Sequence, residues 1–342
     1  MGKEYVQRGS NRAHMVYWGI DMKLFIIGNG FDIGHNLPTS YWDFRTFLVR
    51  VHQNFLNVFE EQYDIYANMH DEQKKAILWS RFETNLANIH EDEIISMGTG
   101  IEMGLESGDI GIEDTLYSYF GKQYKYIEKL AVFLKDWVRT IKIRDCLPRV
   151  SSINPSNHDY FITFNYTAVL ENIYRISPGN VLHIHGSLRE YTPDPIIGHG
   201  NQERILKIQK QIDEADSLFD EKLSSICHVV KDYYTRTLKD IKSHSYSLRT
   251  LLDKKIDEII VIGHSVEGID MPYFDLIDLY TGKAKKWIVY CYDMKEAPTK
   301  KQSLTDAGID GNRIILKGTK EFYDLTDDKA AKEFRTKIKS GF

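Results

Sequence analysis

The chain has 342 residues, which is enough for one large domain or two modest ones. Its charged residues are mixed in sign, and a net charge of -5 excludes the basic footprint of a protein whose main partner is nucleic acid. Aromatic residues are abundant, with 21 tyrosines among them, so the composition excludes a largely disordered chain.

The cysteines and the N-terminus bear on the cellular compartment. Cys146, Cys227 and Cys291 form no C-x-x-C pair, which argues against a structural zinc site and against a disulfide framework. No apolar run approaches the roughly 18 residues that span a bilayer, and residues 1–21 lack the apolar core of a signal peptide. We therefore expect a cytoplasmic protein without membrane contact, in which residues 1–21 form a loose leader.

The first strand is expected at residues 23–27, a mostly apolar run that suits a strand buried on both faces of a parallel sheet. A long helix should start near Thr39, because apolar residues recur there at spacings of three and four. Further helical patterns run over Gln73–Ile89 and Ile112–Ile143, so residues of about 40–145 are predicted to form a helical insertion. The apolar stripes of the first and last helices are Phe44, Phe47, Leu48, Val51, Phe55 and Val58, and Tyr117, Phe120, Tyr124, Ile127, Leu130, Phe133, Leu134 and Trp137.

An alternating pattern of strands and helices then continues to the C-terminus. The expected strands are residues 159–164, 180–185, 258–262, 287–290 and 314–316. Before the third of these, residues 202–254 are charged and helical and form a second predicted insertion. Strands that alternate with helices imply a parallel sheet with right-handed crossovers. The predicted fold is therefore α/β, Rossmann-like, with a mostly parallel sheet in a single domain of residues 22–325 and a helical tail at residues 326–342.

Four short polar segments, most of them with glycine, follow these strands. They are residues 28–32, 165–167, 185–186 and 263–265. In an open parallel sheet, ligands bind beyond the carboxyl ends of the strands. Although the segments are far apart in the sequence, we expect them to converge on one ligand site.

The segment Gly28–Asp32 fits a phosphate-binding turn. Glycines between a strand and a helix let the backbone approach a phosphate and point N–H groups at it. The segment is not the G-x-G-x-x-G dinucleotide fingerprint, because residue 33 is Ile. The alternative is a tight turn that needs positive φ.

Asn165 ends the second predicted strand. Its amide offers a donor and an acceptor, which can hold a ribose hydroxyl or a water molecule. The alternative is an asparagine that stabilises a turn or caps a helix. Thr167 is the expected N-cap of the short helix that follows.

Two histidines are predicted to lie on the same face of one strand, because side chains alternate with a period of two. These are His183 and His185, and His185 stands at the end of the strand, before Gly186. An imidazole with a pKa near 6.5 suits a general base at neutral pH. We assign the catalytic role to His185 and a structural or supporting role to His183.

The remaining candidates have weaker signals. Ser265, at a strand end, is expected to hydrogen-bond a phosphate or a ribose, and His264 to act as a spacer or an oxygen contact. Asp270 fits either a polar contact in the site or the N-cap of the next helix. Asp43 and Glu83 lie on predicted helices, where charged residues usually face solvent. Glu83 stays a minor candidate, because one side of its helix is apolar.

Several short motifs occur in a fixed order along the chain. They are Leu24–Asp32 with Leu37-Pro38-Thr39-Ser40-Tyr41, Phe164-Asn165-Tyr166-Thr167, His183-Ile184-His185-Gly186, Gly198-His199-Gly200 and Gly263-His264-Ser265. This ordered set, which spans roughly residues 22–325, resembles the AbiH family of bacteriophage abortive-infection proteins. AbiH proteins in turn look like distant relatives of sirtuins.

The resemblance implies roles for individual residues. It assigns cofactor binding to Gly28, Asn29, Gly30, Asp32, Asn165, Gly263 and Ser265, and catalysis to Asn165 and His185. In sirtuins, by comparison, Asn29 and Asp32 would be small or hydroxylated residues and Thr167 would be an aspartate. The four-cysteine zinc module of deacetylating sirtuins is absent from the sequence, which argues against deacetylation and for hydrolysis of the cofactor itself.

The leading hypothesis is therefore a phage-defence protein that acts as an NAD+ glycohydrolase, with Asn165 positioning ribose or water and His185 as the base. NAD, or a related nucleotide, is the expected small-molecule partner, and no metal is expected. By analogy with related defence proteins, we also expect a phage-derived trigger and a homo-oligomer. One alternative is a nucleotide sensor without catalysis, with residues 202–254 as the partner surface. Another is a metal-dependent phosphoesterase or nuclease with ligands from His183, His185, His199, His264 and Asp32.

Overall fold

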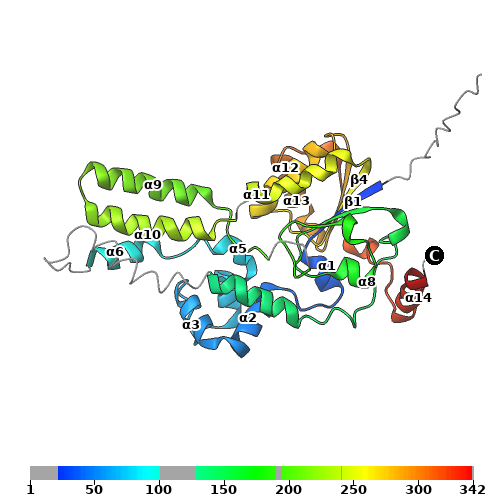
Figure 1. Cartoon of the computed structure of the whole chain (residues 1–342), viewed down its shortest axis with the longest axis horizontal. Helices are drawn as coiled ribbons and strands as arrows, with labels where there is room; N and C mark the ends of the chain where they lie inside the picture. Colours follow the sequence, from blue (N-terminus) through cyan, green and yellow to red (C-terminus); the bar gives the residue numbers. More distant parts are fainter. Residues whose placement is uncertain (1–21, 101–127, 190–194, 240, 341–342) are drawn as a thin grey trace, which may run out of the picture.

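The computed structural model describes residues 22–100, 128–189, 195–239 and 241–340 (Figure 1). The predicted leader lies outside the described residues, and so do the apolar positions Tyr117, Phe120, Tyr124 and Ile127 of the long helical pattern.

Six parallel strands form one sheet in the order β3-β2-β1-β4-β5-β6. The strands are β1 (Met22–Ile27), β2 (Tyr160–Thr163), β3 (Val181–His183), β4 (Ile256–Ile262), β5 (Lys286–Cys291) and β6 (Ile314–Gly318). This confirms the predicted α/β, Rossmann-like fold with a parallel sheet. The strand order reverses between β1 and β4, and the loops that leave the two strands on either side of such a point open a crevice at their carboxyl ends.

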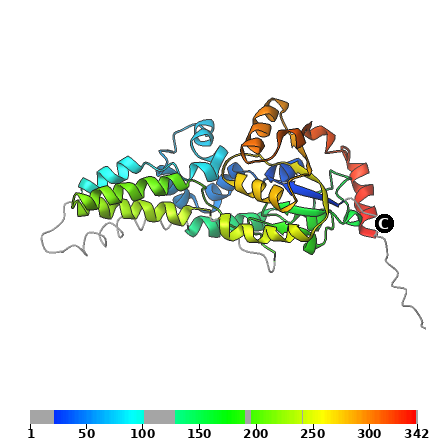
Figure 2. The ribbon, with the colours of Figure 1, turned by 90° about the horizontal axis from the view of Figure 1, so that it is seen from above.

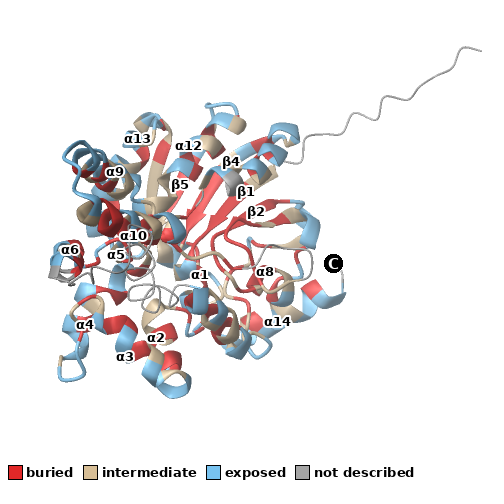
Figure 3. Cartoon of the chain, turned by 60° about the vertical axis from the view of Figure 1, so that its left-hand side comes forward, coloured by how far each residue is buried: buried red, intermediate tan, exposed pale blue. Residues whose placement is uncertain are grey.

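Helices cover both faces of the sheet, so its strands are buried between layers (Figure 3). Leu24 and Ile26 of β1 face one core, which contains Phe274, whereas Phe25 and Ile27 face the other. The first face is covered by α12 (Met271–Tyr280), α13 (Ala297–Asp306) and η4 (Tyr246–Asp253), and the second by α1 (Asn29–Gly34), α8 (Val169–Ile173) and α14 (Asp328–Ser340). Burial on both faces explains why these strands are runs of apolar residues.

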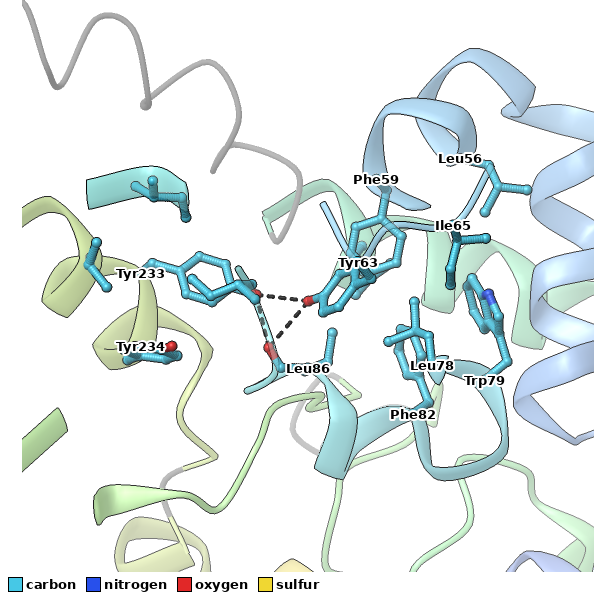
Figure 4. Packing of buried hydrophobic residues seen from close by; sticks show 14 of the residues in the cluster. Leu56, Phe59, Tyr63, Ile65, Leu78, Trp79, Phe82, Leu86, Tyr233 and Tyr234 are labelled. Carbon is cyan, nitrogen blue, oxygen red and sulfur yellow. Dashed lines mark hydrogen bonds between the residues drawn. The ribbon is translucent and has the colours of Figure 1, made fainter. Parts of the chain in front are cut away.

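A third core lies away from the sheet and joins helices from both predicted insertions. We call these helices the helical layer: α2 (Tyr41–Val51), α3 (Gln53–Glu61), α4 (Asp71–Ile77), α5 (Phe82–Asn85), α6 (Glu91–Gly100), the helix at residues 128–140, α9 (Gln202–Ser217) and α10 (Glu221–Thr237). The hydroxyls of Tyr63 and Tyr233 lie 2.9 Å apart, and both are within hydrogen-bond distance of the Leu86 carbonyl (Figure 4). Helices from the two predicted insertions are therefore packed together in one core.

The predicted helices of the first insertion are shorter than expected. The helix predicted after residue 39 breaks at His52, which has φ -136° and ψ 43° and separates α2 from α3. Val51, the last residue of α2, is 57% exposed, and after the break Val58 of α3 is 38% exposed whereas Phe59 lies in the core. The stripe predicted through Val51 and Val58 is therefore wrong.

The pattern over Gln73–Ile89 is likewise divided, into α4, η1 (Trp79–Arg81) and α5. Within the described part of the pattern Ile112–Ile143, only residues 128–140 are helical. Further short turns of 3-10 helix are η2 (Pro155–Asn157), η3 (Pro178–Asn180), η5 (Gly268–Asp270), η6 (Met294–Glu296), η7 (Gly311–Arg313) and η8 (Thr319–Glu321).

Helices α9 and α10 form a hairpin that projects away from the sheet in both views (Figures 1 and 2). The chain returns from this hairpin through α11 (Ile241–Ser245) and η4 to β4. Among the helices of the described residues, none has the length and apolar character to cross a membrane.

Candidate functional site

The four polar segments that follow the strands converge on one cavity of about 290 Å³, at the carboxyl ends of β1 to β4. From the sheet, the cavity is lined by Gly28, Asn29, Asp32, Phe164, Asn165, Tyr166, Thr167, His185, Gly263, His264, Ser265 and Asp270. From the helical layer and the segments beside it come Thr39, Tyr41, Ser80, Glu83, Trp137, Val138 and Ile141. The convergence expected from the strand ends is confirmed, and the helical layer forms the opposite wall.

The glycines after β1 let two turns pack closely. The N–H groups of Gly28 and Gly30 donate to the carbonyls of Ile262 and Gly263, at 2.9 and 2.8 Å. A Cβ on Gly28 would lie 2.6 Å from the Cα of His264, and one on Gly30 would lie 2.8 Å from the Cα of Gly263. These two N–H groups are therefore not free to bind a phosphate. The predicted phosphate-binding turn retains only its other N–H groups and the side chains around it.

Asp32 organises the turn after β2. It is 1% exposed and accepts hydrogen bonds from Nδ2 of Asn165, at 2.9 Å, and from the Thr167 hydroxyl. Burial raises the pKa of Asp32 to about 6 against the effect of these hydrogen bonds. Thr167 is thus not the predicted N-cap, because Ala168 occupies that position of α8. Asp32 supports the wall of the cavity rather than presenting a free carboxylate to it.

Asn165 presents an unsatisfied oxygen. Its Nδ2 donates to Oδ1 of Asp32 and to the Gly28 carbonyl, at 3.2 Å. Both partners are acceptors, so the orientation of the amide is determined. Oδ1 of Asn165 is buried and has no hydrogen-bond partner among the described residues. A buried acceptor without a partner in a cavity wall points to a ligand that donates a hydrogen bond.

His183 and His185 do not share a strand face as predicted, because β3 ends at His183. The ring of His183 contacts the Asn165 carbonyl at 3.1 Å and Oε1 of Glu171 at 2.9 Å. His183 therefore braces the loop that carries Asn165. His185 lies beyond the strand, where the chain turns at Gly186 with φ +76°.

His185 is enclosed by charged groups. It is 3% exposed, and its Nδ1 accepts a hydrogen bond from Nζ of Lys239 at 3.2 Å. Because an ammonium only donates, the ring proton must be on Nε2. Nε2 lies 3.2 Å from Oδ1 of Asp270, which is within ion-pair distance although the hydrogen-bond geometry is poor. Burial and the charge of Lys239 lower the pKa of His185 to about 4.

Lys239 is the centre of this charged cluster. Its side chain is fully buried, and Nζ lies 2.9 and 3.2 Å from the two carboxylate oxygens of Glu83 and 3.5 Å from Oδ1 of Asp270. The loop at Gly198 and His199 positions it, because the backbone of His199 exchanges hydrogen bonds with Thr237 and Lys239. The helical layer thus contributes a carboxylate, and the segment after α10 contributes a cation, to a site that otherwise belongs to the sheet.

The two carboxylates beside Lys239 differ in their pKa. Burial raises the pKa of Glu83 to about 7, with a further contribution from Asp270, despite the opposing effect of Lys239. Burial also acts to raise the pKa of Asp270, but Lys239 and His185 outweigh it and hold that pKa well below its usual range. Near neutral pH, Asp270 is therefore the permanently ionised partner and Glu83 the group that exchanges protons. Asp270 occupies the predicted N-cap position of α12, but its side chain makes no capping hydrogen bond there and faces the charged cluster instead.

A second, larger cavity of about 870 Å³ adjoins the first at the carboxyl ends of β4 to β6. The two cavities share Gly263, His264 and Ser265. The second cavity is lined by Gly30, Ile33, Gly34, Ile262, Tyr290, Tyr292, Lys300, Thr319, Lys320, Tyr323 and Thr326 in addition. It is thus rich in tyrosine rings and carries two lysines, whereas the first carries carboxylates.

The other predicted residues lie at different places. Ser265 is exposed and lines both cavities. Nδ1 of His264 accepts from the Val266 N–H at 2.9 Å, and its Nε2 lies 3.5 Å from Oδ2 of Asp270. Asp43 makes a capping box with Ser40 at the start of α2. Asp43 thus caps a helix, whereas His264 connects its own loop to the charged cluster.

The five residues considered as metal ligands are not gathered into one centre. His183 pairs with Glu171, and His199 packs against the ring of Tyr234. In the part of the chain that the structure describes, no three His, Cys, Asp or Glu side chains are arranged to hold a metal ion.

Sequence reasoning missed Lys239 and undervalued Glu83. Lys239 follows a long charged helix, and nothing in the local sequence distinguishes it from the solvated lysines nearby. Glu83 had a usable signal, because Trp79, Phe82 and Leu86 around it are apolar and all three are buried. A carboxylate among core residues has to be paired, and this one is paired with the lysine.

A family model described as bacteriophage abortive infection AbiH matches residues 24–291. A search of curated proteins finds no significant match. Because the family model covers well over half of the chain, the chain belongs to the AbiH family, whose description places it in antiviral defence by abortive infection. The matched residues include both predicted helical insertions and the four polar segments that line the first cavity.

Proposed function

We propose that this AbiH protein binds a nicotinamide dinucleotide across its two adjoining cavities and hydrolyses the nicotinamide–ribose bond as part of abortive infection. The observation that carries the proposal is the pair of cavities that share Gly263, His264 and Ser265 at the reversal of strand order. Dinucleotides lie across such a reversal, with one nucleotide on each side.

The charges of the two cavities suit the two halves of NAD+. Glu83 and Asp270 border the first cavity with Lys239 as their shared cation, and Tyr41 and Phe164 add ring faces. The nicotinamide ring of NAD+ is a cation, and the ribose carbon gains positive charge as the bond to nicotinamide breaks. Carboxylates and aromatic faces stabilise both.

The second cavity suits the adenosine half and the pyrophosphate. Tyr290 and Tyr323 offer rings against which a purine can pack. Lys300 and Lys320 supply positive charge, and Nζ of Lys300 reaches the His264 carbonyl at 3.0 Å, at the boundary between the cavities. A pyrophosphate beside Ser265 would meet these lysines rather than the occupied N–H groups of the β1 turn.

Within the first cavity, the free Oδ1 of Asn165 is suited to accept a hydrogen bond from a ribose hydroxyl or from the attacking water. The role of His185 is more restricted. It can act as a base only after Lys239 leaves its Nδ1, so in the present geometry it orients Asp270.

The test is the release of nicotinamide from NAD+ by the purified full chain, with and without lysate from phage-infected cells. We expect turnover by the wild type and a loss of about 100-fold in kcat/KM for Asn165→Ala, because a misplaced reactant costs about that much. Asn180→Ala, in η3 and away from both cavities, is the matched control and should keep the wild-type rate. Wild-type protein that binds no dinucleotide would refute the proposal.

A nucleotide sensor is the second candidate, and the position of Lys239 favours it. This lysine belongs to the charged cluster and lies two residues after the end of α10 in the projecting hairpin. A ligand that rearranges the charged cluster can therefore change the position of the hairpin. Calorimetry with NAD+ beside the nicotinamide assay separates the two functions, because tight binding without product indicates a sensor.

A further inference from the structure

We propose that Glu83, which belongs to the helical layer and not to the sheet, is the general base of this site and takes the proton of the attacking water. The inference rests on the proposed hydrolysis of the nicotinamide–ribose bond. The proton acceptor is then not His185 but Glu83, whose carboxylate lines the first cavity.

The position of Glu83 is the first argument. Its side chain is 14% exposed, and it lines the first cavity and also a neighbouring hollow of about 240 Å³ between η1 and η5. Ser80, Thr84 and Asp270 border the same hollow, so polar groups surround the space beside the carboxylate. Glu83 therefore stands between a polar hollow and the space proposed for the ribose.

The way in which Glu83 is held is the second argument. Both carboxylate oxygens contact Nζ of Lys239, and the Gly198 N–H donates a further hydrogen bond. A Cβ on Gly198 would lie 2.5 Å from the Thr237 carbonyl, so the close approach of this loop to the end of α10 requires glycine. Such a rigid setting is what a base needs to meet a water molecule in one geometry.

The rival groups are less free to accept a proton. His185 has its lone pair engaged by Lys239 and its N–H turned toward Asp270. Asp270 is held in its ionised form by Lys239 and His185, so it binds protons weakly. Asp32 is 1% exposed and hydrogen-bonded to Asn165 and Thr167. The Glu83 side chain is 14% exposed, and although both of its oxygens contact Lys239, a carboxylate has further lone pairs with which to meet a water molecule.

The proposed step balances without a redox partner. The bond between ribose C1′ and the nicotinamide nitrogen breaks, and its electron pair cancels the positive charge of the ring. The water oxygen bonds to C1′, and its proton passes to the carboxylate of Glu83. The products are neutral nicotinamide and ADP-ribose, and Glu83 later loses the proton to solvent. The departing ring needs no acid, so one base suffices.

The proposal has a consequence for the pH dependence. Glu83 must be ionised to act, and its pKa is raised to about 7. The groups that face it are Lys239, Asp270, Tyr41 and Tyr166, and burial raises the pKa of both tyrosines, so they stay neutral over this range. We therefore expect kcat/KM for NAD+ to rise with pH and to level off above about 7.

The experiment compares the wild type with Glu83→Gln, which keeps the shape of the side chain but cannot take a proton. We expect nicotinamide release to fall about 100- to 10,000-fold, the usual cost of losing a general base. The affinity for NAD+, measured by calorimetry, should change only a few-fold, and the limb of the pH profile near 7 should disappear from the residual rate.

The matched control is Glu91→Gln. Glu91 is also a buried carboxylate of the helical layer, paired with Arg204 and Lys207, but it lines neither cavity. It should keep the wild-type rate and pH profile. In Glu83→Ala, added formate should restore part of the lost turnover, because it can replace the missing carboxylate, and a purely structural loss would not be restored in this way.

The outcomes separate this inference from the proposed function. If the wild type releases nicotinamide and Glu83→Gln does so equally fast with an unchanged pH profile, Glu83 is not the base, although the hydrolysis stands. If the wild type binds NAD+ without releasing nicotinamide, the hydrolysis and this inference fall together. If Glu83→Gln does not fold, the variant Glu83→Gln/Lys239→Met removes the charge pair as a whole, and a wild-type rate in that variant overturns the inference.

Discussion

The sheet and the helical layer contribute to the same cavity in different ways. The sheet places its polar groups on short turns, such as Gly28–Asp32 and Gly263–Ser265, which are held by backbone hydrogen bonds between neighbouring strands. The helical layer contributes Glu83, and the segment that follows α10 contributes Lys239. Backbone hydrogen bonds thus hold the turns on the sheet side of the cavity, whereas a buried ion pair holds the polar groups on the helical side.

This difference indicates how the site is divided. The turns of the sheet lie at the carboxyl ends of parallel strands, which is where open parallel sheets bind their ligands, so they mark the place of the candidate site. The charged cluster forms only when the two predicted helical insertions pack together, because Glu83 and Lys239 lie 156 residues apart in the sequence. The ionic groups of the candidate site therefore depend on the helical layer as well as on the sheet.

Lys239→Met should have the largest effect on stability. The substitution leaves Glu83 and Asp270 buried without their cation, and removing one partner of a buried ion pair costs about 3–5 kcal/mol. Urea unfolding at pH 7.5 measures the loss. Lys207→Met is the control, because Lys207 pairs with Glu91 but is 59% exposed, and it should cost at most about 1 kcal/mol. Equal losses for the two variants would contradict a special role for the cluster.

Gly263→Ala tests the sheet side. Gly263 has φ +71°, and a Cβ there would lie 2.2 Å from the backbone nitrogen of Phe31. We expect a loss of about 2–5 kcal/mol, from the left-handed backbone and the overlap together. Gly179→Ala meets no atom within 4 Å and should stay within about 0.5 kcal/mol of the wild type. A tolerated Gly263→Ala would mean that the two turns do not pack as described.

Acid should destabilise the sheet side through His35, whose ring contacts the Phe31 carbonyl and the Tyr174 hydroxyl. Burial lowers the pKa of His35 from 6.5 to about 4. Between these values the unfolded chain binds a proton that the folded protein does not, so stability falls as the pH falls from 6.5 to 4, by up to about 3 kcal/mol. His35→Gln should show a smaller loss between pH 7 and pH 4.5 in urea unfolding, and an unchanged loss would refute the assignment.

Val51→Ala should have the smallest effect. Val51 belongs to the predicted stripe but is 57% exposed at the last position of α2, so the change should stay within about 0.5 kcal/mol. Leu48→Ala, one turn earlier and fully buried, should cost about 2–5 kcal/mol. Similar losses at both positions, measured by urea unfolding, would contradict the exposed position of Val51 and support the apolar stripe predicted through it.

Much of the fold and part of the site could be predicted from the sequence. The strands are apolar runs because both faces of the sheet are covered, and this signal is local. The turns after them, including Asn165 and Ser265, could be located for the same reason. Helix breaks such as the one at His52 could not, because no proline or glycine marks the break and the His52 ring stacks on Phe133, which is distant in the sequence.

The parallel α/β sheet, the cavity at its strand ends and the residues that the sheet presents there could be derived from local sequence patterns. The tertiary structure alone decided the ionic character of that site. His185 could be singled out by its position at a strand end, but its partners could not. Its low pKa, the raised pKa of Glu83 and the cation between them arise from burial and from contacts between segments far apart in the chain, and no local sequence signal records such contacts.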